Sequence, residues 1–134
     1  MLATGDQYTE EFSFSQEDVQ AFAEVSGDHN PIHLDDAVAA ETVYKKPILH
    51  GMLGASVFSR IIGMKFPGEG TVYLNQTLQF KRPMYPSDAY RAELTILEVE
   101  ERRKRARIET KIVQVADGKP VLVGEAYVMN KSKL

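Results

Sequence analysis

The longest apolar stretch of the chain runs from His50 to Gly63 and predicts a helix. Arg60 is its single charged residue. Because a surface helix keeps a polar face, a helix that is apolar nearly all round is predicted to be buried. The stretch is shorter than the roughly 20 apolar residues of a membrane span, so we expect it to be enclosed by a small protein. Its apolar residues cover most of the helical wheel: Met52, Leu53, Val57, Phe58, Ile61 and Ile62.

The residues before this stretch predict a strand and a helix. Residues 7–14 contain a short polar and apolar alternation, which is typical of an edge strand. Ser15, followed three positions later by Asp18, is a variant of the capping box and predicts where the helix begins. Gly27 is typical of the residue that ends a helix.

The segment 28–33 is predicted to be an irregular, stiff loop. Pro31 lacks a backbone N–H and restricts the conformation of Asn30. Asp35 or Asp36 then provides an N-cap for a short helix.

From Thr71 onward the pattern is that of β-strands. Residues 71–80 predict one strand with Val72, Leu74, Leu78 and Phe80 on its apolar face. Gln76 interrupts that face, which indicates either a polar group at a pocket or interface, or a hydrogen bond to a neighbouring strand. Further strands are predicted at 92–100, 107–115 and 121–129, the last two joined by the strong hairpin signal Asp117-Gly118.

This order of elements predicts a single α+β domain over residues 1–134. Short turns join the later strands, so successive strands should be antiparallel neighbours. Such a sheet has one face to bury, and the central helix is the obvious partner. A curved antiparallel sheet wrapped around a central apolar helix is the hot-dog fold. Its edge strands invite pairing with a second copy, so we expect a homodimer.

Composition narrows the possible functions. The net charge of the 134-residue chain is −3, which gives no indication of nucleic-acid binding. The absence of cysteine excludes disulfides, cysteine-ligated zinc and a thiol nucleophile. No apolar signal-peptide core follows Met1, and we expect no membrane partner.

The chain ends in Ser132-Lys133-Leu134, which is a peroxisomal address in a eukaryote. The alternative is a frayed, charged tail that has this sequence by chance. Because the domain stands alone, we favour a bacterial, cytoplasmic protein and keep the peroxisome as the alternative.

The chemistry of the chain concentrates around two of its three histidines, His29 and His33, which lie beside Asp28 in one short segment. A metal site would need both histidines on one helical face, and Pro31 argues against that helix, so we predict no metal. A second interpretation is a satisfied turn, because Asp and Asn bond readily to nearby backbone groups.

The third interpretation of this segment is acid–base catalysis on water. A carboxylate and an imidazole that reach one water molecule can take its proton and return a proton to the product. The spacing of Asp28 and His33 across a proline turn lets the two side chains converge.

A longer pattern favours this third interpretation. Residues 26–35, Ser-Gly-Asp-His-Asn-Pro-Ile-His-Leu-Asp, followed by 47–53, Pro-Ile-Leu-His-Gly-Met-Leu, resemble the hydratase 2 motif of the MaoC-like family. Its members include the (R)-specific enoyl-CoA hydratases. The resemblance extends to 70–76, with Phe80 and Pro83, and to Gly124-Glu125-Ala126. The length is similar to that of the short bacterial members that supply monomers for polyhydroxyalkanoate synthesis.

The resemblance implies roles for individual residues. Asp28 and His33 would activate the water that adds to C3 of a trans-2-enoyl thioester, while a proton is delivered to C2. Asn30 would hold the loop or the water. Gly51 would polarise the thioester carbonyl with its backbone N–H, which fits the unpaired, partly positive N–H groups of a helix start.

Three further residues carry less specific expectations from the same resemblance. Ser59 would lie near the catalytic pair, with a hydroxyl that bonds back to its own helix as the alternative. Ile62 and Val128 would line the acyl pocket, with core packing as the alternative.

We therefore expect reversible hydration of trans-2-enoyl-CoA to (R)-3-hydroxyacyl-CoA. CoA would enter only as part of the substrate, with no metal or redox cofactor. One alternative is a MaoC-like dehydratase of a branched or acidic acyl-CoA, or of an acyl carrier protein thioester. Others are a hot-dog thioesterase and a non-catalytic acyl-binding subunit.

Overall fold

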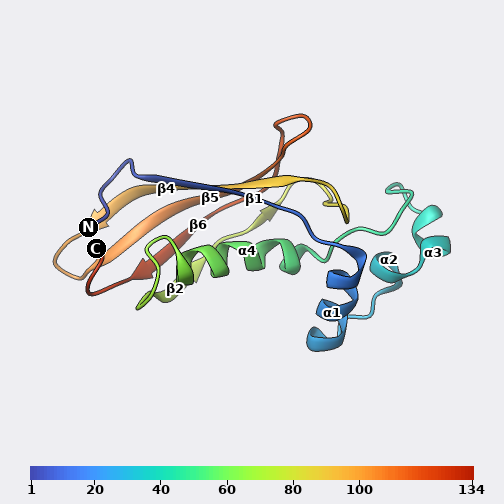
Figure 1. Cartoon of the computed structure of the whole chain (residues 1–134), viewed down its shortest axis with the longest axis horizontal. Helices are drawn as coiled ribbons and strands as arrows, with labels where there is room; N and C mark the ends of the chain where they lie inside the picture. The colour runs from blue at the N-terminus through green and yellow to red at the C-terminus, as the bar shows by residue number, and fades with distance from the viewer.

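A computed structural model describes the whole chain, Met1–Leu134, as one six-stranded antiparallel sheet and four helices (Figure 1). The helices are α1 (Gln16–Ser26), α2 (Pro31–Leu34), α3 (Asp36–Ala40) and α4 (Gly51–Met64). The strands are β1 (Gln7–Phe12), β2 (Val72–Gln76), β3 (Gln79–Phe80), β4 (Tyr90–Glu100), β5 (Arg105–Gln114) and β6 (Pro120–Met129).

The sheet has the strand order β1-β4-β5-β6-β2, and the short β3 also pairs with β6. The predicted neighbours β4, β5 and β6 are confirmed as consecutive antiparallel strands. The turn between β5 and β6 contains Gly118 with a φ of 70°, as the Asp-Gly signal predicts. β1 and β2 form the two edges of the sheet, so their outer backbone groups have no partner strand within this chain.

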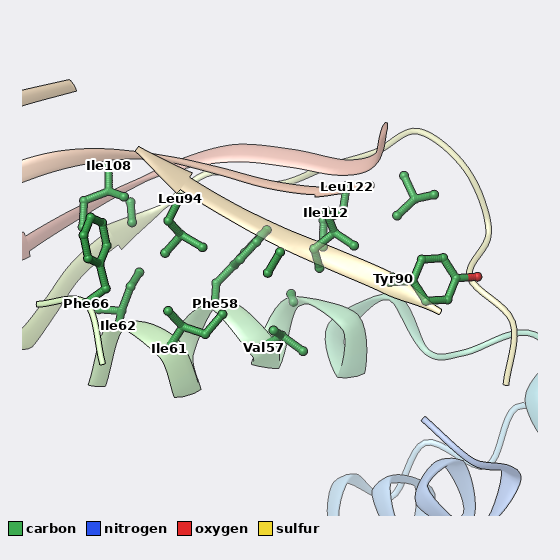
Figure 2. Close-up of a cluster of buried hydrophobic side chains, with 14 of the residues drawn as sticks. Val57, Phe58, Ile61, Ile62, Phe66, Tyr90, Leu94, Ile108, Ile112 and Leu122 are labelled. Carbon is green, nitrogen blue, oxygen red and sulfur yellow. The ribbon is translucent and has the colours of Figure 1, made fainter. Parts of the chain in front are cut away.

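The predicted central helix is confirmed as α4, which runs along one face of the sheet (Figure 1). Apolar side chains of α4 and of the strands β4, β5 and β6 form the core between them (Figure 2). Phe58, Ile61 and Leu94 are fully buried there. The expectation that α4 is enclosed on all sides is wrong, because a single sheet covers only one side of it. Met52 and Arg60 are exposed on the other side.

The prediction of one strand over residues 71–80 is also wrong in two respects. The segment is divided into β2 and β3, and a register shift lies between Tyr73 and Asn75. Because side chains alternate with a period of two, such an irregularity changes which residues face the core. Tyr73 packs against the core, whereas Val72 and Leu74 are exposed.

Gln76 makes hydrogen bonds across the sheet, as one of its two interpretations predicted. Its Nε2 donates to Oγ1 of the buried Thr110 on β5 at 3.0 Å. Its Oε1 accepts a hydrogen bond from the Tyr73 hydroxyl. Burial raises the pKa of Tyr73 to about 12, so this hydroxyl remains a donor.

The three short helices α1, α2 and α3 lie together beyond the end of the sheet, next to the N-terminal end of α4 (Figure 1). The capping box of Ser15 and Asp18 is confirmed at the start of α1. Gly27 ends α1 with a φ of 79°, a left-handed conformation that glycine adopts without strain.

The expected irregular loop over 28–33 is wrong for its second half. Pro31 begins the helical turn α2, because its fixed φ suits a first helical position and its missing N–H has no role there. The prediction of a short helix after Asp35 is confirmed by α3.

The chain terminus is packed rather than frayed. The Leu134 side chain is 1% exposed and belongs to the core. Oδ1 of the buried Asn130 accepts hydrogen bonds from the backbone N–H groups of Ser132 and Lys133. Whether the protein is cytoplasmic or peroxisomal stays a prediction. No helix has both the length and the apolar character needed to cross a membrane.

Candidate functional site

The carboxylate of the site lies in the turn between α1 and α2. The backbone N–H of Asp28 donates to the Ser26 hydroxyl at 3.1 Å, and the Asp28 carboxylate accepts from the N–H of Asn30 at 3.2 Å. Oδ1 of Asn30 in turn accepts from the N–H of Ile32 at 3.2 Å and caps α2. Each of these side chains accepts a hydrogen bond from the backbone N–H two residues later. Such bonds hold a short irregular segment in place without the burial of apolar side chains.

His33 lies on the single turn of α2 and is buried, with 8% of its surface exposed. Its Nδ1 lies 2.8 Å from the carbonyl oxygen of Ile48. Because a carbonyl only accepts, Nδ1 carries the proton and donates. Nε2 then keeps its lone pair and can accept a proton or a hydrogen bond.

The environment of His33 favours the neutral imidazole. Burial lowers its pKa below the ordinary value of 6.5, and the neighbouring His50 lowers it further. The hydrogen bond to Ile48 and the carboxylate of Asp28 oppose that shift. A neutral ring at physiological pH is the form that can accept a proton from water.

His50 lies directly beside His33, at the N-cap position of α4. Its side chain makes no capping hydrogen bond. The two imidazole rings stack with centroids 3.9 Å apart and an interplanar angle of 27°. Nε2 of His50 lies 2.9 Å from the backbone carbonyl oxygen of Asp28, so it donates to that oxygen.

The site therefore brings together Asp28, His33 and His50, each of which has one polar side-chain atom within 4.8 Å of such an atom of the other two. Two imidazoles and a carboxylate are groups that hold a divalent metal. The same groups also perform acid–base chemistry on water. His29 is exposed and is not part of this cluster. The two histidines of the site are therefore His33 and His50, and not the pair His29 and His33 that was considered from sequence spacing.

The N-terminal end of α4 adds hydrogen-bond donors to the cluster. Gly51 is the first residue of α4, and the N–H groups of a first helical turn have no partner within the helix. The ring of Phe80 on β3 packs close to it, so that a Cβ built on Gly51 would lie 2.7 Å from Cε1 of Phe80. Glycine is thus the residue that fits between the helix start and this ring.

Two cavities meet at the cluster, and both are lined by His33, His50, Gly51 and Phe80. The first, which we call the Tyr44 cavity, has a volume of about 330 Å³ and is otherwise mostly apolar. The second, the Phe22 cavity, has a volume of about 430 Å³. A substrate with two long arms can place its reacting centre at the shared wall and one arm in each cavity. The Tyr44 cavity adds Leu49, Lys81, Arg82 and Met84, and the Phe22 cavity adds Ser26, Asp28 and Met52.

The remaining predicted site residues lie elsewhere. Ser59 is on the exposed side of α4, eight positions beyond Gly51 in the sequence, or about 12 Å along the helix axis. Ile62 and Val128 are buried in the core. Asn30 holds the loop by capping α2 and lines neither cavity. The roles of Ser59, Ile62 and Val128 in substrate binding stay predictions.

Two residues of the site were not predicted as functional from the sequence. The sequence places His50 at the start of the apolar stretch and inside the hydratase 2 motif, and it places Phe80 on the apolar face of a predicted strand and within the resemblance. It assigns neither side chain a role at the site. The scarcity of histidine is the signal that points to His50, because two of the three histidines share one site. No pattern in the neighbouring sequence indicates a functional role for Phe80, because its contact with Gly51 joins residues that are distant in the sequence.

A comparison with protein families matches residues 3–117 to the family described as MaoC like domain. The (R)-specific enoyl-CoA hydratase of Aeromonas caviae is 43% identical over 115 residues, which are 86% of this chain and 85% of that protein. A mitochondrial 3-hydroxyacyl-[acyl-carrier-protein] dehydratase of Arabidopsis thaliana is 36% identical over 128 residues, covering 94% of this chain and 76% of that protein.

The fold has a close counterpart among solved structures. The (R)-hydratase from A. caviae involved in PHA biosynthesis superposes with a TM-score of 0.92 at 40% sequence identity. The match covers 96% of this chain and 97% of that one. The predicted hot-dog fold is confirmed by this similarity.

Proposed function

Because this chain belongs to the MaoC-like domain family, we propose that it is a hydro-lyase that reversibly adds water to trans-2-enoyl-CoA and forms (R)-3-hydroxyacyl-CoA. The observation that carries this proposal is the convergence of Asp28 and His33 at the Phe22 cavity, next to the wall that this cavity shares with the Tyr44 cavity. Similarity to a named (R)-specific enoyl-CoA hydratase over most of both chains supports the substrate and the stereochemistry.

The proposed reaction uses the unprotonated Nε2 of His33 and the carboxylate of Asp28 as two acceptors for one water molecule. A proton leaves the water as its oxygen bonds to C3 of the enoyl thioester. The electron pair of the double bond moves toward the thioester carbonyl, and a proton is delivered to C2. Water is thus added across the double bond with no net oxidation, and the reverse steps remove it.

Negative charge develops on the thioester oxygen during this addition. We propose that the N–H of Gly51, at the partly positive end of α4, donates to that oxygen. One such donor contributes on the order of 3 kcal/mol to the stabilisation of a transition state. The three parts of the proposed site are the water-binding pair, the oxyanion donor and the two cavities.

We propose that the reaction needs no metal or redox cofactor, since it moves only protons and water. Incubation with EDTA followed by dialysis should leave kcat unchanged, although Asp28, His33 and His50 are groups that hold metals. Loss of activity that a divalent metal restores would contradict this.

We further propose that CoA, rather than acyl carrier protein, carries the acyl group. Lys81 and Arg82 line the Tyr44 cavity and would lie near the phosphates of CoA. The similarity to the hydratase named for PHA biosynthesis supports a role in supplying (R)-3-hydroxyacyl monomers for such polymers. The similarity to an acyl carrier protein dehydratase makes the carrier protein the second candidate.

We propose that two copies of the chain form a homodimer. β2 is an edge strand, and Val72 and Leu74 expose apolar surface on it. Such an edge favours pairing with another strand. Light scattering should give twice the 15.0 kDa mass of the chain.

The activity is tested with crotonyl-CoA. The proposal predicts that the absorbance of the conjugated enoyl thioester disappears without release of free thiol, and that chiral analysis finds the (R)-3-hydroxy product. Release of free CoA would instead indicate a thioesterase. No change in either readout, with binding retained, would indicate an acyl-binding subunit.

Rates measured with different thioesters test whether CoA or acyl carrier protein carries the acyl group, and which acyl group is preferred. Crotonyl-CoA should be hydrated faster than crotonyl-acyl carrier protein at equal concentration. A higher kcat/KM for the carrier-protein thioester, or for a branched or acidic acyl-CoA, would favour the corresponding dehydratase instead.

A further inference from the structure

His50 occupies a position that links all parts of the proposed site. It precedes Gly51, its ring stacks on His33, and its Nε2 donates to the backbone carbonyl of Asp28. On another side its ring contacts Phe22 of α1, with centroids 4.8 Å apart. The residue is 2% exposed, so it is held by protein rather than by solvent.

The hydrogen bonds of the two histidines fix complementary tautomers. His33 donates from Nδ1 to Ile48, which leaves its lone pair on Nε2. His50 donates from Nε2 to Asp28, which places a ring proton on Nε2. In each ring the nitrogen that carries this proton is identified by a backbone carbonyl, which only accepts hydrogen bonds.

Nδ1 of His50 is buried without a hydrogen-bond partner. A buried acceptor without a partner is unfavourable, and few are found in folded proteins. Phenylalanine or leucine would fill the same space without that cost. An imidazole is therefore explained by what its other nitrogen does, which is to donate to Asp28.

We propose that His50 is a positioning residue of the hydration reaction. Its Nε2–H holds the Asp28 backbone against the N-terminal end of α4, beside the His33 ring on which the His50 ring stacks. The carboxylate, the water-accepting nitrogen and the oxyanion donor are thereby kept in one rigid arrangement. His50 takes and gives no proton in this role, which rests on the proposed hydration at Asp28 and His33.

The test compares two substitutions that separate the hydrogen bond from the ring. His50→Phe keeps an aromatic ring between Phe22 and His33 but removes the donor to Asp28. His50→Gln keeps an N–H at a similar distance from the backbone and removes the ring. His29→Gln is the matched control, because His29 directly follows Asp28 in the sequence and is exposed.

We expect His50→Phe to lower kcat for crotonyl-CoA by about tenfold to a hundredfold, since small displacements of reacting groups have effects of this size. KM should change little, because phenylalanine keeps an aromatic ring on the wall shared by the two cavities. His50→Gln should recover most of the lost kcat, and His29→Gln should equal the native protein. A native kcat for His50→Phe, or a loss in His50→Gln as large as in His50→Phe, would overturn the positioning role.

A second measurement covers the case in which His50→Phe does not fold. Nitrogen-15 NMR of the native protein should find the His50 proton on Nε2 and the His33 proton on Nδ1. A His50 proton on Nδ1 would overturn the proposal. This readout needs no turnover, so it also separates a failure here from a failure of the hydratase function, which the crotonyl-CoA assay of the native protein detects.

Discussion

The core under the sheet and the segment that carries Asp28 and His33 are held in place by different forces. In the core, side chains of α4 such as Phe58 and Ile61 are excluded from water against β4, β5 and β6. Between residues 26 and 36, order comes mainly from side chains that bond backbone groups two or three positions away. The core is built by burial, and the catalytic segment by local polar contacts.

This difference predicts how each region responds to substitution. Burial of a large apolar side chain contributes free energy to the whole fold, so a defect in the core lowers stability first. A lost contact in the polar segment leaves the core intact but displaces the reacting groups. The N-terminal end of α4 lies where the two regions meet, and His50 and Gly51 belong to both.

The largest expected effect on stability is in the core. Phe58→Ala removes a fully buried ring between α4 and the sheet and should lower the free energy of unfolding by about 3–5 kcal/mol. Urea denaturation measures this change. Gln20→Ala, on the exposed side of α1, is the control and should have little effect. Equal stability of the two variants would contradict the division between core and segment.

At the boundary of the regions, Gly51→Ala should lower kcat/KM by roughly tenfold or more, in the range found for damaged oxyanion sites. The added Cβ would lie 2.7 Å from Cε1 of Phe80, so this ring, which lines both cavities, must move. Gly63→Ala is a matched control in the same helix, because a Cβ there meets nothing within 4 Å.

Gly63→Ala should keep native kinetics and raise stability slightly, since alanine favours helix over glycine. Similar kinetics for Gly51→Ala and Gly63→Ala would show that the contact with Phe80 has no bearing on the reaction.

Within the polar segment, Asn30→Ala removes the cap of α2 and should lower stability by about 1 kcal/mol. The drop in kcat should be larger than this loss of stability suggests, because the cap supports the turn between Asp28 and His33. Asn30→Ser keeps a capping oxygen and should restore most of the activity. If serine fails to restore it, Asn30 has a direct role with the water instead.

The smallest expected effect concerns pH. Burial lowers the pKa of His33 from its ordinary value of 6.5, and His33 must be neutral to accept a hydrogen bond from water. On the acid side, kcat/KM should therefore fall to half its maximum at a pH below 6.5. A half-maximal point above pH 6.5 would contradict the lowered pKa of His33.

Protonation of His33 is also expected to lower the free energy of unfolding as pH falls. Above pH 6.5 His33 is neutral in both the folded and the unfolded chain and contributes nothing. Below it, the unfolded chain binds a proton more readily than the folded one. Stability should therefore fall over that range and the loss should level off below the lowered pKa.

Local signals account for most of the fold that the sequence predicts. The apolar pattern of α4, the capping box of Ser15 and the hairpin at Asp117-Gly118 each act over a few residues, so each can be read from the chain. The face of β2 could not be read in this way, because the irregularity after Tyr73 changes the phase of the alternation.

The candidate site shows the same distinction between features that local sequence predicts and features that depend on long-range contacts. Asp28 and His33 lie close in the sequence, so their convergence was predictable from a short turn. The stacking of His50 on His33 joins residues from different helices and depends on how α2 and α4 meet. The contact of Phe80 with Gly51 likewise depends on where β3 pairs with β6.

The most direct test of the account is to measure activity and thermal stability together for Asp28→Asn and His33→Gln. Asp28→Asn keeps the shape of the side chain, and His33→Gln keeps a polar side chain that can form hydrogen bonds, while each removes the acid–base function. We predict that each lowers kcat for crotonyl-CoA by at least about 100-fold, the scale of a lost acid–base group, while the melting temperature stays close to native. Near-native turnover in either variant would contradict hydration by this pair.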